Sequence, residues 1–267
     1  MSPTDLRDGV LEREAMAALA AVLDPELDEP ITDLGFVRSL SAGTRGDVVV
    51  HLRLPTSFCS PSFAYLMASD AKDALTALPR VRSVVMQLDD HHDSDLINRG
   101  LAADAGYRGT FAAEAEDSLD CLRETFRRKA HTAAMERALT ALLRSDPGLS
   151  ENDLYQVTLG DLPDAPTTEA LRRRRAALGL GTDAGSRVLV DGTGASYPQH
   201  EVPLRLRMAR SVRVSIDGNA HFCRGLLRTR YPESAQDQAP CVHGDTDPAA
   251  PARTTSHPLL PLEVNAS

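Results

Sequence analysis

The chain has 267 residues and a formal net charge of −9, with 42% hydrophobic and 25% charged side chains. This is the balance of an ordinary soluble protein that is long enough for two domains. The negative charge argues against nonspecific nucleic-acid binding. The sequence shows neither a secretion signal nor a run of about 18 apolar residues, so we expect a cytoplasmic protein with no nucleic-acid or membrane partner.

Two further features of composition narrow the class. Basic side chains are nearly all arginine, with lysine only at Lys72 and Lys129, and this bias together with the many alanines indicates a high-GC bacterial genome. The cysteines are few and none forms a CxxC pair, so we expect neither a disulfide framework nor a self-contained zinc site. They are Cys59, Cys121, Cys223 and Cys241.

Charge is distributed unevenly along the chain. Residues 1–100 carry 16 acidic and 9 basic side chains, which gives this region a net charge of −7. Residues 202–231 carry seven arginines and only one acid, Asp217. The two regions are therefore expected to meet different partners or each other.

The first 95 residues alternate helix and strand patterns in a simple order. Apolar residues recur at helical spacing until Pro25 ends the first helix. Apolar residues then alternate with His51 and Arg53, which indicates a strand with one buried face. The expected elements are a helix at 10–23, strands at 36–40 and 48–54, a helix at 61–79 and a strand at 81–88. This α-β-β-α-β order predicts a small α+β sandwich domain over residues 1–95.

Beyond residue 95 the patterns predict a helical segment and then a small, mostly β C-terminal region. Residues 96–115 are weakly patterned, and helices are expected at 118–143 and 167–178, the second closed by Gly179. Strands are expected at 187–190, 202–208, 212–216 and 221–227, with a hairpin turn at 217–219. We therefore expect a helical region at 96–180, a basic β-rich region at 181–231 and a disordered tail at 232–267.

The loop at 54–61 holds the best single candidate for chemistry, Cys59. It lies one residue before Ser60, a good N-cap, and Pro61, a good first helical residue. The free amides and the positive end of the helix dipole favour a thiolate there. A metal ligand and a nucleophile both need a thiolate, whereas a free cysteine is also often a small buried residue.

Three segments together carry a family resemblance. They are Leu23-Asp24-Pro25-Glu26-Leu27, Ile31-Thr32-Asp33-Leu34-Gly35-Phe36-Val37, and the loop from Thr56 to Cys59. Over about residues 10–90 the chain resembles the PaaD-like and SufT-like family of metal–sulfur (iron–sulfur) cluster assembly factors. That family has a DPE turn, an I-x-D-L-G-[LF]-[VI] segment and a T-x-x-x-C-P loop on the same α-β-β-α-β frame. Here Ser60 separates the cysteine from Pro61, and the loop has one residue fewer after Thr56.

The resemblance implies a role in assembling or delivering iron–sulfur clusters to a client metalloprotein. It makes Cys59, Asp24, Glu26 and Thr56 the functional positions, with iron or an iron–sulfur cluster as a transient cargo. A cluster usually takes four protein ligands, so one thiolate needs help. A homodimer could supply Cys59 twice, or Asp24 and a small thiol could complete the ligand set. Some family members resemble helpers of multicomponent oxygenases, so the client could also be a binuclear-iron oxygenase.

A second candidate metal site is the acidic run at 89–95. His91 and His92, flanked by carboxylates, offer nitrogen and oxygen ligands suited to iron. Adjacent residues on an extended segment point to opposite sides, so a solvated acidic loop is the alternative. His221 and Cys223 are expected to share one face of a strand, which is compatible with a metal but equally with an ordinary surface. The basic face of that region is expected to bind phosphate, an acidic protein or the acidic N-terminal domain.

A rival hypothesis of another class is a thiol enzyme. Cys59 would be the nucleophile, His51 or His91 the base, and the helix amides an oxyanion hole. A third hypothesis is an adaptor whose metal site no longer functions.

Overall fold

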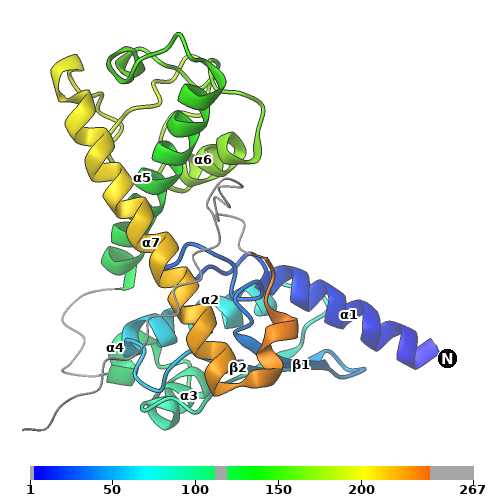
Figure 1. Ribbon diagram of the computed structural model, residues 1–267. Helices are drawn as coiled ribbons and strands as arrows, with labels where there is room; N and C mark the ends of the chain where they lie inside the picture. Colours follow the sequence, from blue (N-terminus) through cyan, green and yellow to red (C-terminus); the bar gives the residue numbers. More distant parts are fainter. Residues whose placement is uncertain (1–2, 112–118, 241–267) are drawn as a thin grey trace, which may run out of the picture.

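The computed structural model describes residues 3–111 and 119–240, which form an α+β fold of two lobes joined by one long helix (Figure 1). The α+β class expected from the sequence is therefore confirmed. The first lobe is built around a small sheet. Its elements are α1 (Pro3–Leu19), β1 (Val37–Ala42), β2 (Asp47–Arg53), α2 (Pro61–Thr76), β3 (Ser83–Asp89), α3 (Ser94–Ala102) and α4 (Gly106–Phe111).

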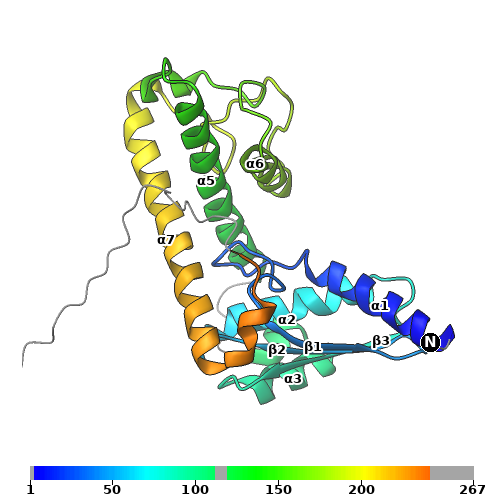
Figure 2. The same cartoon turned by 45° about the vertical axis from the view of Figure 1, so that its right-hand side comes forward.

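The sheet has the strand order β1-β2-β3, with β1 antiparallel and β3 parallel to β2. A tight turn suffices for the first pair, whereas the parallel pair needs the crossover that α2 provides. Val48, Val50 and Leu52 of β2 are buried, as their alternation predicts. Helices α1 and α2 cover one face of the sheet and α3 lies on the other (Figure 2).

The predicted α-β-β-α-β order is confirmed, although the lobe continues past residue 95. The first helix ends at Leu19, earlier than expected, and turns fill the chain up to β1. Helices α3 and α4 occupy the weakly patterned stretch, and Ile97, Leu101 and Phe111 join the same core. The pattern was weak because these helices are short and each buries only a few residues.

The second lobe is helical and has its own core. Its elements are α5 (Leu119–Ser145), η2 (Glu151–Tyr155), α6 (Pro166–Ala177), η3 (Gln199–Glu201) and α7 (Val202–Arg230). Helices α5 and α6 are the two predicted from spacing, and Gly179 follows α6 with a φ of 68°, the left-handed conformation that closes helices. The N-terminal half of α7 contributes Val202, Leu206 and Ala209 to this core.

Helix α7 overturns the expectation of a mostly β C-terminal region. One helix of 29 residues stands where strands at 202–208, 212–216 and 221–227 were predicted. Around position 187 the structure has only isolated bridges. The alternation of Leu204, Leu206 and Met208 predicted a strand wrongly, because a short apolar run fits the period of a helix as well as that of a strand. The helical period prevails because α7 buries one stripe in both cores, and the helix runs through Gly218, where a hairpin turn was expected.

The segment after α7 is packed against the sheet lobe, in contrast to the tail expected from Pro232. Residues Pro232–Asp237 form the short helix η4. Arg53 of β2, only 1% exposed, donates to Glu233 at 3.1 Å and to Asp237 at 2.5 Å. The rest of the predicted tail, residues 241–267 with Cys241, lies outside the described residues. Within the described part of the chain, no helix is both long and apolar enough to span a bilayer.

Candidate functional site

The loop between β2 and α2 holds Cys59 with its side chain half-buried against the main core. The thiol lies 3.5 Å from the hydroxyl of Thr56, which also accepts a hydrogen bond from the amide of Phe58 at 3.2 Å. Phe58 itself is 81% exposed. Ser60 occupies the N-cap position as predicted, but its hydroxyl bonds that of Ser62 at 2.8 Å and does not cap the helix.

His91 fixes the backbone of this loop. Its ring is buried, and its Nδ1 accepts a hydrogen bond from the amide of Asp93 at 3.1 Å. The other nitrogen, Nε2, therefore carries the proton and donates to the carbonyl of Cys59 at 2.8 Å. His92 is exposed, with its ring centroid 5.8 Å from that of Phe58. The Nε2 of His91 thus holds the backbone of the thiol loop, while its Nδ1 is occupied by the amide of Asp93.

The metal site predicted at His91 and His92 stays a prediction. Among residues 3–111 and 119–240, no group of three or more His, Cys, Asp or Glu side chains is placed to hold one metal ion. The buried His91 and the exposed His92 differ in surroundings, as expected for neighbours that point apart.

The Asp24-Pro25-Glu26 segment forms a tight turn around a buried carboxylate. Asp24 is 7% exposed, and its Oδ1 accepts hydrogen bonds from the amides of Glu26 and Leu27, each at 2.8 Å. Burial raises the pKa of Asp24 to about 7, the two amide hydrogen bonds oppose the rise, and the charges of Glu26 and Glu29 add to it. Asp24 is therefore poised to gain or lose a proton near neutral pH.

Helix α7 lies directly over this acidic turn. Asn219 donates its side-chain N–H to Glu26 at 3.2 Å. Arg224 forms a buried ion pair with Glu29 and donates to the carbonyl of Asp33 at 2.9 Å. The basic C-terminal region and the acidic N-terminal region thus meet each other, which was one of the alternatives raised by their charges. The contact is made by a helix, so the expectation of a basic sheet face is corrected.

Cys223 lies on α7 between these two contacts. It is half-buried and packs, like Cys59, against the core of the sheet lobe. Burial raises the pKa of the Cys223 thiol to about 12, and negative charge at Asp24, Cys59 and Glu26 contributes to the rise.

The sequence did not predict that Cys223 packs against the core of the sheet lobe. It placed Cys223 on one face of a strand with His221, whereas residues two apart on a helix lie about 200° apart around the axis. His221 is accordingly exposed. The helical spacing from Asn219 to Cys223 was the signal that could have placed the thiol on the inward side of α7.

The C-terminal end of α7 holds the thiol loop from a second side. Arg230 donates to the carbonyl of Leu54 at 3.1 Å and to the hydroxyl of Ser57 at 2.8 Å, and it also contacts the carbonyl of Asp90. The hydroxyl of Tyr231 donates to the carboxylate of Asp90 at 2.8 Å. The loop is therefore restrained by its own Thr56, by His91 from the segment after β3, and by Arg230 from α7.

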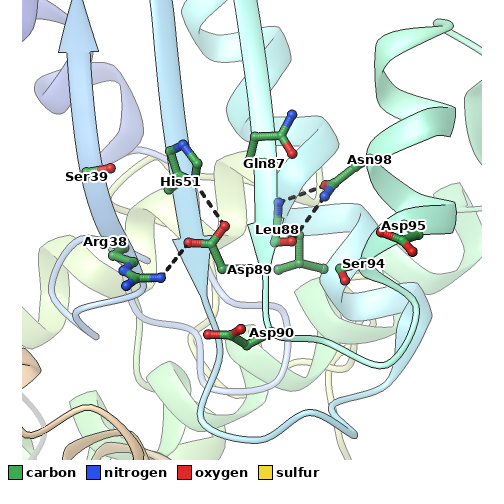
Figure 3. Close-up of a pocket in the computed structure, with 10 residues that line it drawn as sticks. All are labelled: Arg38, Ser39, His51, Gln87, Leu88, Asp89, Asp90, Ser94, Asp95 and Asn98. Carbon is green, nitrogen blue, oxygen red and sulfur yellow. Dashed lines mark hydrogen bonds and ion pairs between the residues drawn. The ribbon is translucent and has the colours of Figure 1, made fainter.

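A polar pocket of about 550 Å³ lies elsewhere, over the face of the sheet beside α3 (Figure 3). One carboxylate oxygen of Asp89 accepts a hydrogen bond from Arg38, and the other contacts the Nδ1 of His51. Both distances are 3.0 Å. Cys59 does not line this pocket. His51 contacts a carboxylate and His91 contacts a carbonyl, so neither predicted base is hydrogen-bonded to the thiol in the described structure.

Comparison with known proteins locates a family match in the sheet lobe. Residues 12–86 match the sequence profile of the family described as iron-sulfur cluster assembly protein. Over 53 residues the chain is 45% identical to a protein of Mycobacterium tuberculosis named "Iron-sulfur cluster carrier protein", a match that covers 20% of this chain and 14% of the relative. Over 89 residues it is 35% identical to the protein of that name from Mycobacterium leprae, covering 33% and 23%.

The chain thus spans less than a quarter of the length of these relatives. A crystal structure of a domain of unknown function from Bacillus anthracis aligns with 25% identity and a TM-score of 0.30, covering 39% of this chain and 99% of that one. The matched segment contains Asp24, Glu26, Thr56 and Cys59 and ends before His91 and helix α7.

Proposed function

We propose that the protein carries iron or an iron–sulfur cluster on Cys59 for delivery to a client metalloprotein, a role supported by the match of residues 12–86 to the family described as iron-sulfur cluster assembly protein. The observation that carries the proposal is the restrained loop of Cys59. Among the described residues no histidine is hydrogen-bonded to its thiol, while Thr56, His91 and Arg230 fix the loop that presents it. Such an arrangement suits a ligand better than a nucleophile, because a nucleophilic thiol is activated by an adjacent base or a lowered pKa.

An incomplete ligand set also favours transfer over storage. Clusters usually take four protein ligands, so one thiolate leaves positions for a client, a second copy of the chain or a small thiol. Asp24, which is half-protonated near pH 7, can lose its proton when a cation approaches and so add negative charge beside the cargo. The proposed clients are iron–sulfur proteins or a component of an iron-dependent oxygenase, and the proposed setting is the bacterial cytoplasm.

Anaerobic reconstitution with ferrous iron and sulfide tests this function. The wild type and Cys121→Ser, which alters an exposed cysteine on α5, should bind equal amounts of iron and sulfide and show the absorption of a cluster. Cys59→Ser should lose both. The loaded wild type should then transfer its iron to a plant-type apo-ferredoxin used as a generic acceptor.

Retention of the full iron content by Cys59→Ser would contradict the proposal. The thiol-enzyme hypothesis predicts instead that an electrophilic probe labels Cys59 at a rate that depends on His51 or His91. Labelling of Cys59 that is unchanged in His51→Ala excludes that base.

A further inference from the structure

We propose that the outer face of α7 binds a second copy of this chain, with the two α7 helices antiparallel. Eight large hydrophobic side chains are exposed among the described residues, and four of them belong to α7: Leu204, Met208, Val214 and Phe222. Both lobes lie on the same side of α7, so the described chain leaves the opposite face of the helix uncovered (Figure 2). Apolar side chains gathered on one exposed face of a soluble protein mark an interaction surface.

This face carries the repeat of a helix–helix seam. Six exposed residues follow one another at alternating spacings of four and three positions, and we call them the outer strip: Leu204, Met208, Ser211, Ser215, Gly218 and Phe222. The same alternation of four and three marks the two positions of a heptad that face a partner helix. The strip is about 27 Å long at the rise of an α-helix. The residues that α7 buries in the two cores lie on its other side.

The outer strip is complementary to itself when two copies run antiparallel about a two-fold axis at its midpoint. Met208 of one copy then lies opposite Gly218 of the other. Leu204 in the same way lies opposite Phe222. The space that a side chain at Gly218 would fill is open within the described chain, so Met208 of the second copy can enter it. Glycine destabilises the interior of a helix, and a partner that packs on Gly218 gives this residue a use.

Charge selects the antiparallel arrangement. The N-terminal part of α7, residues 202–213, carries four arginines and no acid. The C-terminal part lies against the sheet lobe, where the exposed Glu26 accepts a hydrogen bond from Asn219 and where residues 1–100 have a net charge of −7. An antiparallel pair places the basic half of each helix beside the acidic lobe of the other copy. A parallel pair would place like charges together, which is unfavourable.

This arrangement keeps the two thiol loops apart, a consequence that rests on the proposed function. Arg230, at the C-terminal end of α7, holds the loop of Cys59 through Ser57. The C-terminal ends of antiparallel helices lie at opposite ends of the pair, so the two copies of Arg230 are about 50 Å apart. A dimer of this kind cannot supply Cys59 twice to one cluster. Each copy therefore presents its own cargo to its own client.

Sedimentation velocity over a series of concentrations of the full-length reduced chain tests the dimer. One helix face buries less than the roughly 800 Å² per partner of a standard interface, so the wild type should dimerise reversibly. Gly218→Gln adds a side chain where the chain itself leaves space, so the monomer should fold normally while Met208 of the second copy is excluded. Overpacking of this kind should weaken dimerisation at least about tenfold.

Two further variants form a matched pair. Phe222→Gln removes the apolar contact at one end of the outer strip and should also weaken dimerisation. Val85→Gln makes the same kind of change at an exposed hydrophobic side chain of β3 and should match the wild type. A wild type that stays monomeric up to about 1 mM overturns the proposal. A dimer that is as stable in Gly218→Gln and Phe222→Gln as in the wild type shows that the copies do not meet through α7.

The orientation is tested by oxidising cysteine variants of the outer strip and identifying the linked peptides by mass spectrometry. The antiparallel pair places residue 211 of one copy opposite residue 215 of the other. Ser211→Cys should therefore form a disulfide with Ser215→Cys when the two proteins are mixed. Each variant linking to itself instead would overturn the antiparallel arrangement, because only a parallel pair places identical residues opposite each other.

Iron content separates this inference from the proposed function. After anaerobic reconstitution, the wild-type dimer and the Gly218→Gln monomer should bind the same amount of iron per chain. Iron that is lost together with the dimer would overturn the separation of the two thiol loops. No iron in either protein would overturn the proposed function and leave the dimer through α7 standing.

Discussion

The interface with α7 and the open pocket over the sheet use the same kinds of side chains in different surroundings. At the interface, Glu29 is paired with Arg224 and both are nearly inaccessible to water. In the pocket, Asp89 is paired with Arg38, whose side chain is 46% exposed. A buried charge depends on its ion-pair partner, because water cannot reach the charge to replace that partner. An exposed charge is solvated by water whether or not its partner is present. The interface should therefore govern both the stability of the lobe and the geometry of the thiol site.

The largest effect is expected from Arg224→Met. The change leaves Glu29 buried without its partner, and breaking a buried pair from one side costs about 3–5 kcal/mol of the free energy of unfolding. Urea unfolding followed by circular dichroism measures the loss. In the double variant Arg224→Met/Glu29→Gln the buried charge is gone, so much of the loss should be recovered. No recovery would mean that Arg224 acts through its contacts with the carbonyls of Asp33 and Ala239.

The second prediction concerns the pH dependence of Asp24. Its pKa of about 7 in the folded chain exceeds the value of about 3.9 in an unfolded chain, so the folded state holds the extra proton between these pH values. Stability should therefore fall as pH rises from about 4 to 7, by at most roughly 4 kcal/mol at about 1.4 kcal/mol per pKa unit. Asp24→Asn cannot ionise, so it should gain stability relative to the wild type at pH 8 but not at pH 4.

The matched control for Asp24 is Asp183→Asn in the helical lobe. A hydrogen bond from Ser186 holds the pKa of Asp183 below its usual value, so this carboxylate is ionised at every pH above about 4. The difference between Asp183→Asn and the wild type should stay constant from pH 5 to pH 8. Urea unfolding at several pH values measures both variants. The assignment of Asp24 fails if its variant follows the wild type in parallel across this range.

A third and smaller effect is expected at His91. His91→Ala removes the donor to the carbonyl of Cys59, and an unsatisfied buried group costs about 1–3 kcal/mol. The loosened loop should also let an alkylating reagent reach Cys59 faster. His92→Ala is the matched control. The exposed ring of His92 makes no such bond, so its removal should change neither the free energy of unfolding nor the rate of alkylation of Cys59. Equal effects of the two variants would show that the ring bond does not hold the loop.

The sequence predicted the sheet lobe because β2 and β3 each bury alternate residues and α2 is a long, mostly apolar helix that begins at a clear proline signal. Cys59 and the Asp24 turn were identified as candidate site residues because three short motifs follow one another in the sequence. Each motif lies within a few consecutive residues, so it can be recognised without the fold. Arg53 shows where this reasoning ends. Alternation assigned it to the exposed face of β2, yet it is buried because η4, which comes from residues 232–237, covers it. No local pattern records which distant segment will cover a strand.

The same limit explains the missed members of the site. Arg230 reaches the thiol loop, and Cys223 packs against the core of the sheet lobe, only because α7 is one continuous helix, whereas the ambiguous alternation at its start predicted strands. His91 was treated as a metal ligand because its acidic neighbours suggest one. In the structure its Nε2 donates to the carbonyl of Cys59, a backbone atom that side-chain patterns do not report.

The smallest effect is expected in the pocket, from Arg38→Ala. The variant removes one ion pair of Asp89, but water can solvate the carboxylate and His51 still contacts it. Exposed pairs contribute about 0–1 kcal/mol and are screened by salt, so the change in unfolding free energy should be near the low end and vanish at high salt. The same urea titration that measures Arg224→Met measures this variant. If Arg38→Ala lowered the free energy of unfolding as much as Arg224→Met, burial would not explain the difference between the two regions. The interface with α7 would then give the thiol loop no more rigid a support than the exposed pocket has.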